Sequence, residues 1–177
     1  MAALAKKFDV LAPEHPGFGA SDTPEWLDNV ADLANFYLDF LEQLDLTGVH
    51  LIGSSLGGFW AQVLAPEFDA SMVLINPSVR PDETLARHVG RYRNEATGGE
   101  TVLTATDVAE LRHYRVEPCD PRVPTLVLLD SADEVLDYRV AEAAFRGCGR
   151  TLVYPGGSHR FEHLPEALPE IRALYRG

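Results

Sequence analysis

The sequence has no apolar run that approaches the roughly 20 residues of a transmembrane helix. Its first residues place Lys6 and Lys7 after a short apolar stretch rather than before a long one, which is not the pattern of a secretory signal. Basic residues are also scarce, because 15 Lys and Arg face 27 Asp and Glu. The resulting net charge of −12 repels nucleic acids and anionic lipid surfaces. We therefore predict a cytoplasmic protein with no nucleic-acid or membrane partner.

Cysteine is equally scarce. Cys119 and Cys148 are the only two, too few and too isolated for a disulfide framework or a zinc site. We expect both to be small buried or half-exposed side chains in a reducing compartment.

The composition that remains is that of one ordinary globular domain, which we place at residues 1–177. Hydrophobic residues make up 46% of the chain and charged residues 24%. Short segments rich in Val, Ile and Leu without alternation are typical of strands in a parallel sheet that is covered on both faces. Five segments have this pattern, at residues 8–12, 49–53, 71–76, 124–129 and 150–154.

Helical patterns lie between these segments. The clearest covers residues 24–46, with Thr23 as its cap and Pro24 in its first turn, and others are predicted at 56–67, 138–145 and 165–175. This alternation predicts an α/β fold with a mostly parallel sheet and right-handed crossovers. Residues 77–122 break the rhythm, with weak helical patterns at 83–89 and 107–113. We assign them to a cap inserted over the carboxyl ends of the strands, where open α/β sheets bind ligands.

The strongest chemical signal is a G-x-S-x-G sequence from Gly53 to Gly57. It follows a hydrophobic segment and precedes a helical pattern, the context in which the serine lies on a strained turn and acts as a nucleophile. The glycines two positions before and after that serine must be small to let the backbone pass. Ser55 is then the candidate nucleophile and the backbone N–H of Leu56 one oxyanion donor. An ordinary Gly-Ser turn is the alternative.

A serine hydroxyl needs a base, and the base needs an orienting acid, expected downstream in the order Ser, acid, His. Asp133 lies three residues beyond the fourth segment, far enough to turn back toward a histidine. Asp130 is less well placed, because it directly follows that segment. The alternative is that Asp130, Asp133 and Asp137 only solvate the loop. His159 follows the fifth segment and two glycines, and we predict it as the base.

Residues 159–163 match H-x-x-E-H, an inverted zinc-protease motif. Such a site needs both histidines on a helix, whereas His159 follows two glycines in a loop. We therefore expect no metal, and the proposed chemistry needs no cofactor.

The substrate pocket is predicted from residues close to the nucleophile in the sequence or at the end of the first segment. Its predicted members are His15, Phe18, Ser54 and Phe59. We expect Trp60 to be a core residue.

Four stretches together resemble the YqiA/YcfP group of small esterases within the α/β-hydrolase superfamily. They are GSSLGGF at 53–59, NPSVRP at 76–81, DEVLDYR at 133–139 and GGSH at 156–159. The resemblance implies a three-layer α/β-hydrolase-like fold of about five strands. It also implies a cytoplasmic carboxylesterase with Ser55, Asp133 and His159 as its triad.

The chain departs from the superfamily at its start. Members have an early strand ending in a His-Gly loop that supplies the second oxyanion donor, and this sequence has no such segment, so either the start is truncated or the protein works without it. If segment 8–12 lies beside the nucleophile strand instead, the N–H of Gly17 or Phe18 takes the place of that donor. Without a replacement we expect weak activity, because loss of one oxyanion donor costs about 100- to 1000-fold in rate.

Strands in sequential order with right-handed crossovers carry all their connecting helices on one face. The final helix alone is then left to cover the other face, and an apolar sheet face favours association, so we predict a homodimer. The function predicted is a serine hydrolase that cleaves small esters through an acyl-enzyme. Thioester or carbon–carbon bond hydrolysis with the same triad, and a non-catalytic binding protein of this fold, stay open.

Overall fold

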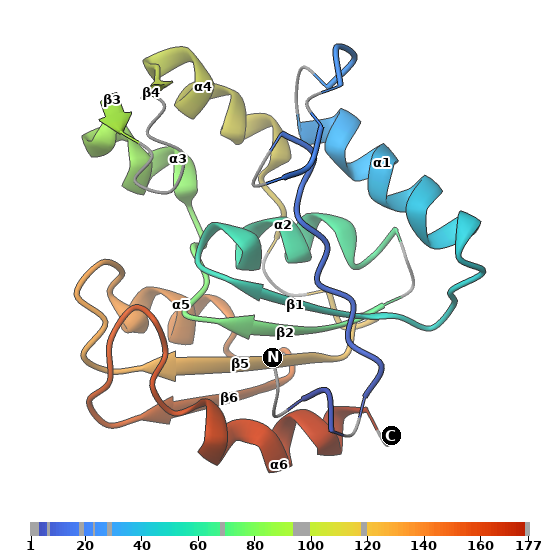
Figure 1. The fold of residues 1–177 in the computed structure, drawn as a ribbon. Coiled ribbons are helices and arrows are strands. Elements are labelled where there is room, and N and C mark those ends of the chain that lie inside the picture. The colour runs from blue at the N-terminus through green and yellow to red at the C-terminus, as the bar shows by residue number, and fades with distance from the viewer. Residues whose placement is uncertain are drawn as a thin grey trace. The chain divides into compact units, whose positions relative to one another are not determined.

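The computed structural model describes residues 4–6, 8–17, 20–22, 24–27, 30–67, 70–93, 100–117 and 120–175. Its contacts divide the chain into two compact units, one of residues 1–47 and 91–101 and one of residues 48–90 and 102–177. Figure 1 shows the elements, which in chain order are α1 (Val30–Gln43), β1 (His50–Ser54), α2 (Leu56–Leu64), β2 (Ser71–Ile75), α3 (Pro81–Thr84), η1 (Leu85–His88), β3 (Gly90–Arg93), β4 (Glu100–Leu103), α4 (Ala105–Glu110), η2 (Leu111–Tyr114), β5 (Thr125–Asp130), α5 (Tyr138–Ala144), β6 (Arg150–Tyr154) and α6 (Leu164–Leu174).

The second unit is built on a four-stranded parallel sheet in the order β1-β2-β5-β6. These strands confirm four of the five predicted segments. The prediction of a fifth strand at residues 8–12 is wrong, because these residues form no strand in the structure. Their local composition favours a strand, but Pro13 directly after them lacks a backbone donor and restricts the residue before it.

Helices cover this sheet on both faces. The core on one face joins Ala61 of α2 and Phe145 after α5 to Met72, Leu74 and Val127 of the strands. Strand side chains alternate between faces, so the buried Val73 and Leu128 point to the opposite face. Helix α6 packs against β5 and buries Ala167 and Ile171 (Figure 1). The sheet therefore carries its connecting helices on one face and its last helix on the other.

The helices of the second unit lie close to their predicted positions. Helix α1 of the first unit is shorter than predicted, because it begins at Val30 rather than at Pro24. Thr23, its predicted cap, lies outside the described residues. None of the described helices is long and apolar enough to span a membrane.

The predicted cap segment contains α3, η1, α4 and η2, together with the two-stranded sheet of β3 and β4, which the sequence analysis did not predict. In the second unit its helices are tied together at Asp82, whose carboxylate is buried and accepts hydrogen bonds from Arg112 (3.2 Å) and Arg115 (3.1 and 2.5 Å). Burial raises the pKa of Asp82, but hydrogen bonds from Arg115 and Arg112 and the charge of Arg115 outweigh it and hold this pKa below its usual value.

Cys148 is buried, as predicted, but it is disulfide-bonded. The prediction that the two cysteines are too few and too isolated for a disulfide framework did not anticipate this bond. Spacing along the chain does not report the distance in space that decides whether a disulfide forms.

Candidate active site

Ser55 lies on the turn between β1 and α2. Its backbone φ of 54° and ψ of −121° is a conformation that costs energy for a residue with a side chain. The turn is held by its neighbours: the N–H of Ser55 donates to the carbonyl oxygen of Ile75 at 3.0 Å, and the N–H of Ser78 donates to the carbonyl oxygen of Ser55 at 3.0 Å. The end of β2 thus fixes the backbone of the candidate nucleophile from both sides.

The turn requires glycine at two positions, and they are not both the expected ones. A Cβ on Gly53 would lie 2.2 Å from the carbonyl oxygen of Gly57, and one on Gly58 would lie 2.8 Å from Cβ of Pro77. A Cβ on Gly57 would meet nothing within 4 Å. The steric reasoning holds for Gly53, is wrong for Gly57, and applies to Gly58 instead.

The structure brings Ser55, His159 and Asp133 together at the carboxyl ends of β1, β5 and β6. The hydroxyl of Ser55 lies 2.9 Å from Nε2 of His159, and Nδ1 of His159 lies 2.8 and 3.0 Å from the two carboxylate oxygens of Asp133. A carboxylate only accepts hydrogen bonds, so Nδ1 carries the proton and Nε2 is left to accept from the serine hydroxyl. The Asp133 side chain is 2% exposed and that of His159 20%. In this geometry the buried carboxylate orients the imidazole of His159 through Nδ1, while the ring stays partly open to solvent.

The acid is oriented by its own loop. Oδ1 of Asp133 accepts hydrogen bonds from the N–H groups of Val135 (2.8 Å) and Leu136 (2.9 Å). Glu134, exposed, accepts from the N–H of His159 at 3.0 Å. Hydrogen bonds from its own N–H and from that of His159 lower the pKa of the Glu134 carboxyl.

Three polar residues at this end of the sheet were not singled out by the sequence analysis as site residues. Asn76 and Asp130 are buried at the ends of β2 and β5, and both bind the backbone of residues 156–163, which we call the base loop. His163, the last residue of that loop, donates from Nδ1 to Asp130 at 2.7 Å. Two features of the sequence could have pointed to these residues: the motif NPSVRP, which begins with Asn76, and the position of Asp130 at the end of a strand.

The zinc motif has a structural explanation. His163 bonds to Asp130 and His159 to Asp133, so both histidines of H-x-x-E-H have carboxylate partners. The described part of the chain contains no cluster of three or more His, Cys, Asp or Glu able to hold a metal ion.

The remaining predicted site residues lie in different surroundings. Leu56 is the first residue of α2, and Ser54 is exposed at the end of β1. Phe59 is 1% exposed and packs edge-on against Trp60, so its side chain lies in the core, and its place in a substrate pocket stays a prediction. Small glycines around it in the sequence do not reveal which face of α2 is buried.

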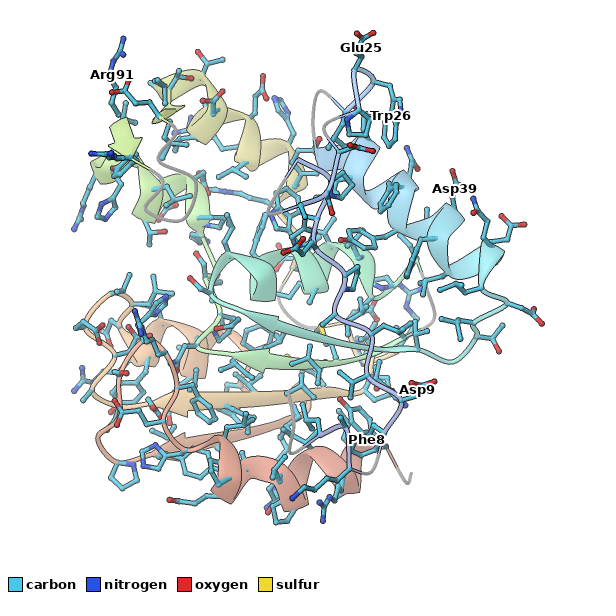
Figure 2. All side chains as sticks on the ribbon, in the orientation of Figure 1. Phe8, Asp9, Glu25, Trp26, Asp39 and Arg91 are labelled. Atoms are coloured by element: carbon cyan, nitrogen blue, oxygen red, sulfur yellow. The ribbon has the colours of Figure 1, made fainter. Side chains whose placement is uncertain are left out.

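In the first unit, His15 accepts or donates a hydrogen bond with the hydroxyl of Tyr37 at 2.6 Å and packs edge-on against its ring. The N–H of Gly17 donates to the carbonyl oxygen of Asp22 at 2.8 Å, so it is already used within its own turn. Phe18 lies outside the described residues. Figure 2 shows Trp26 beside the start of α1 and Asp39 on the helix, and with Phe36 and Phe40 they border a surface pocket of about 410 Å³.

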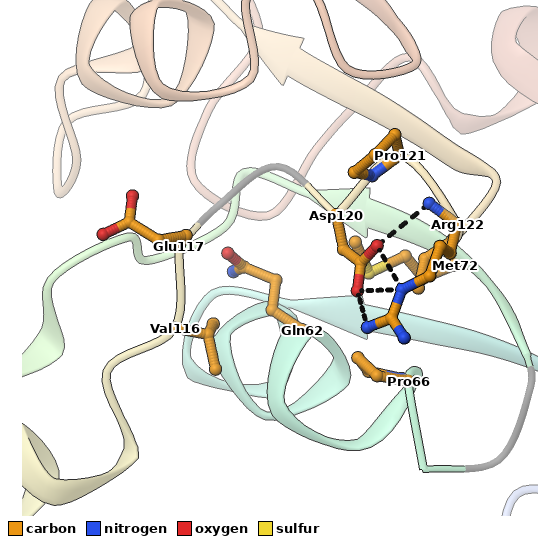
Figure 3. Close-up of a pocket in the computed structure, with 9 residues that line it drawn as sticks. Gln62, Pro66, Met72, Val116, Glu117, Asp120, Pro121 and Arg122 are labelled. Carbon is orange, nitrogen blue, oxygen red and sulfur yellow. Dashed lines mark hydrogen bonds and ion pairs between the residues drawn. The ribbon is translucent and has the colours of Figure 1, made fainter.

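A second pocket, of about 340 Å³, lies in the other unit beside the amino ends of β2 and β5 (Figure 3). Gln62 and Met72 line it together with the ion pair Asp120–Arg122. The hydrogen bonds from Arg122 lower the pKa of Asp120 to about 2. The strands run between this pocket and the Ser55 site, so the two lie at opposite ends of the sheet.

The fold, with a strained serine between strand and helix and an aspartate and a histidine after the two later strands, is that of the α/β hydrolases. A thermophilic esterase from Thermogutta terrifontis is similar in structure, with a TM-score of 0.70 at 21% identity over 98% of this chain and 83% of that one. Residues 17–176 match the family model of UPF0227, described as an uncharacterised protein family, and the chain belongs to that family.

The curated relatives are longer than this chain. A UPF0227 protein from Shewanella sp. strain MR-4 is 26% identical over 127 residues, which are 72% of this chain and 65% of that protein. A Mycobacterium bovis protein described as uncharacterised is 43% identical over 67 residues, 38% of this chain and 20% of its own length. The chain therefore spans a fifth to two thirds of the relatives that it matches.

Proposed function

We propose that the protein is a serine hydrolase that cleaves carboxylic esters. The observation that carries this proposal is the continuous hydrogen-bonded line from Ser55 through His159 to Asp133, with distances of 2.9 and 2.8 Å. In this line His159 is held in the one tautomer that accepts the serine proton. The esterase among the structural neighbours supports the choice of an ester as substrate.

In the proposed reaction Oγ of Ser55 attacks the ester carbonyl carbon while Nε2 of His159 takes the hydroxyl proton. Asp133 stabilises the imidazolium that forms, and His159 passes the proton to the departing alkoxide. Water, activated by the same histidine, then releases the acid from the acyl-enzyme. The N–H of Leu56, at the positive end of α2, is the proposed donor to the oxyanion.

The expected rate depends on whether a second N–H group joins that of Leu56 in binding the oxyanion. The predicted second donors are Gly17, whose N–H is bonded to Asp22, and Phe18, outside the described residues. Loss of one donor costs about 100- to 1000-fold. Turnover of small esters slower by this factor is therefore the expected result if neither residue supplies the second donor.

The test is hydrolysis of a short p-nitrophenyl ester by the wild-type chain and by Ser55→Ala, with circular dichroism to show that both are folded. Turnover that disappears in Ser55→Ala, together with labelling of Ser55 by a fluorophosphonate, is the expected result. Equal background rates and no labelling in two folded proteins would refute the proposal and leave the non-catalytic alternative. Parallel assays with a thioester and a vinylogous diketone distinguish the other hydrolases that use this triad.

A further inference from the structure

The backbone around the catalytic base is held by side chains that play no part in the proposed proton transfer. Asn76 is 2% exposed, and its Nδ2 donates to the carbonyl oxygens of Ser158 (3.0 Å) and His159 (3.2 Å). Its Oδ1 accepts from the N–H of Asp130 at 2.8 Å. One amide group therefore joins the end of β2 to the end of β5 and to the base loop.

Asn76 lies between the two residues that hold the nucleophile. The carbonyl oxygen of Ile75 accepts the hydrogen bond from the N–H of Ser55, and the N–H of Ser78 donates to the carbonyl oxygen of Ser55. The segment 75–78 thus binds the backbone of Ser55 and, through Asn76, the backbone of His159. A shift of the backbone of Ser55 relative to that of His159 therefore strains hydrogen bonds to this one segment.

Asp130 holds the base loop both before and after His159. Its carboxylate is fully buried and accepts hydrogen bonds from the N–H groups of Ser158 (3.2 Å) and Glu162 (2.8 Å) and from Nδ1 of His163 (2.7 Å). The ring of His163 stacks on Tyr154 of β6 at 5.1 Å. The loop also passes so close that a Cβ on Gly157 would lie 1.9 Å from Oδ2 of Asp130.

From this arrangement we propose that Asn76 and the Asp130–His163 pair are positioning residues for His159. They clamp the base loop on both sides of His159, so that Nε2 of His159 stays within bonding distance of Ser55. The inference rests on the proposed function, because it assigns these residues to the same reaction. None of the three touches the hydroxyl that reacts.

The first test is Asn76→Asp, which keeps the acceptor oxygen and the shape but replaces two N–H donors with an oxygen that faces two carbonyl oxygens. A displaced base is expected to lower kcat about 100-fold, with KM within twofold. Thr151→Val is the matched control, since the hydroxyl of Thr151 is buried with no hydrogen-bond partner among the described residues and lies away from the site. Wild-type kcat in folded Asn76→Asp, or an equal loss in Thr151→Val, would overturn the proposal.

The second test compares His163→Asn with His163→Leu. Asparagine places an N–H where Nδ1 of histidine lies, so it is expected to restore kcat, whereas leucine leaves one buried oxygen of Asp130 without its donor and lowers kcat. A role confined to stability would lower the midpoint of unfolding but leave kcat per folded molecule unchanged in both variants.

A readout that does not need turnover separates this inference from the proposed function. The proton on Nδ1 of His159, bonded to Asp133, gives a downfield proton NMR resonance that His159→Ala removes. This resonance should persist in His163→Asn and Thr151→Val and be lost or exchange-broadened in Asn76→Asp and His163→Leu. Persistence in all four would refute the clamp, even if the wild-type protein proves to have no esterase activity.

Discussion

Replacing Asp133 by asparagine is expected to reverse the tautomer of His159 without moving it. Oδ1 of Asp133 accepts two backbone N–H groups, from Val135 and Leu136, and only an oxygen can occupy that place. The amide nitrogen of the variant must therefore occupy the position of Oδ2, 2.8 Å from Nδ1 of His159. That nitrogen is a donor at the shorter of the two contacts, and Oδ1, 3.0 Å from Nδ1, already accepts two backbone N–H groups. We therefore expect Nδ1 to accept from the amide, so that the proton moves to Nε2, where it faces Ser55.

A base with a proton on Nε2 cannot take the serine proton. The same change of tautomer in a protease triad lowers kcat about 10⁴-fold, and at about 1.4 kcal/mol for each factor of ten this is a barrier rise of about 5.5 kcal/mol. We expect a loss of this order in Asp133→Asn, measured as p-nitrophenyl ester hydrolysis from pH 5 to 9. The free energy of unfolding should change little, since the carboxamide keeps the shape and the backbone bonds. A kcat above a tenth of the wild-type value in Asp133→Asn would show that the tautomer of His159 is not set in this way.

Three further predictions concern stability and assembly. Gly53→Ala is expected to lower the free energy of unfolding by about 1–3 kcal/mol, because its Cβ would lie 2.2 Å from a carbonyl oxygen. Gly57→Ala, which has open space around its Cβ and a helical position, should raise the free energy of unfolding by about 0.5–1 kcal/mol. Urea titration of the two variants would contradict the steric assignment if Gly57→Ala proved the less stable. Partial burial lowers the pKa of His50, which stacks on Tyr175 at 4.0 Å, so the unfolded chain binds the proton first on acidification. The contribution of neutral His50 to stability is complete above the ordinary histidine pKa of about 6.5 and declines as pH falls from there through the folded-state pKa. A wild-type pH profile of stability no steeper than that of His50→Asn would exclude this contribution. The homodimer predicted from the sheet face, on which Ile52 of β1 is 43% exposed, should appear in light scattering as a particle of twice the chain mass, and a monodisperse monomer would end that expectation.

The sequence predicts the strands of the second unit because each is an uninterrupted apolar run, and a strand buried on both faces leaves that mark locally. Residues 8–12 carry a similar mark and form no strand. A strand exists only where a partner supplies the other half of its hydrogen bonds, and local composition does not contain that information.

The candidate triad is predictable for a similar reason, because turn glycines and strand ends place Ser55, Asp133 and His159 at one edge of a parallel sheet. The clamp is not. Asn76 donates to the carbonyl oxygens of Ser158 and His159, which lie 82 and 83 positions further along the chain. Because the acceptor is a backbone oxygen, any residue type could stand at the partner position, and the sequence carries no sign of the bond. Likewise, only the path of the backbone shows that Gly58 rather than Gly57 meets Pro77.

The distance along the chain between the candidate nucleophile and its candidate base also bears on how the protein folds. Ser55 and His159 are 104 positions apart, and β2 and β5 lie between their strands in the sheet. Forming contacts of such long sequence separation costs loop-closure entropy before the contacts themselves stabilise the chain. We therefore expect them to form in the late steps of folding. Under the proposed function, labelling of Ser55 by a fluorophosphonate requires the last strand to be in place, so the rate of labelling during refolding is expected to follow the docking of that strand.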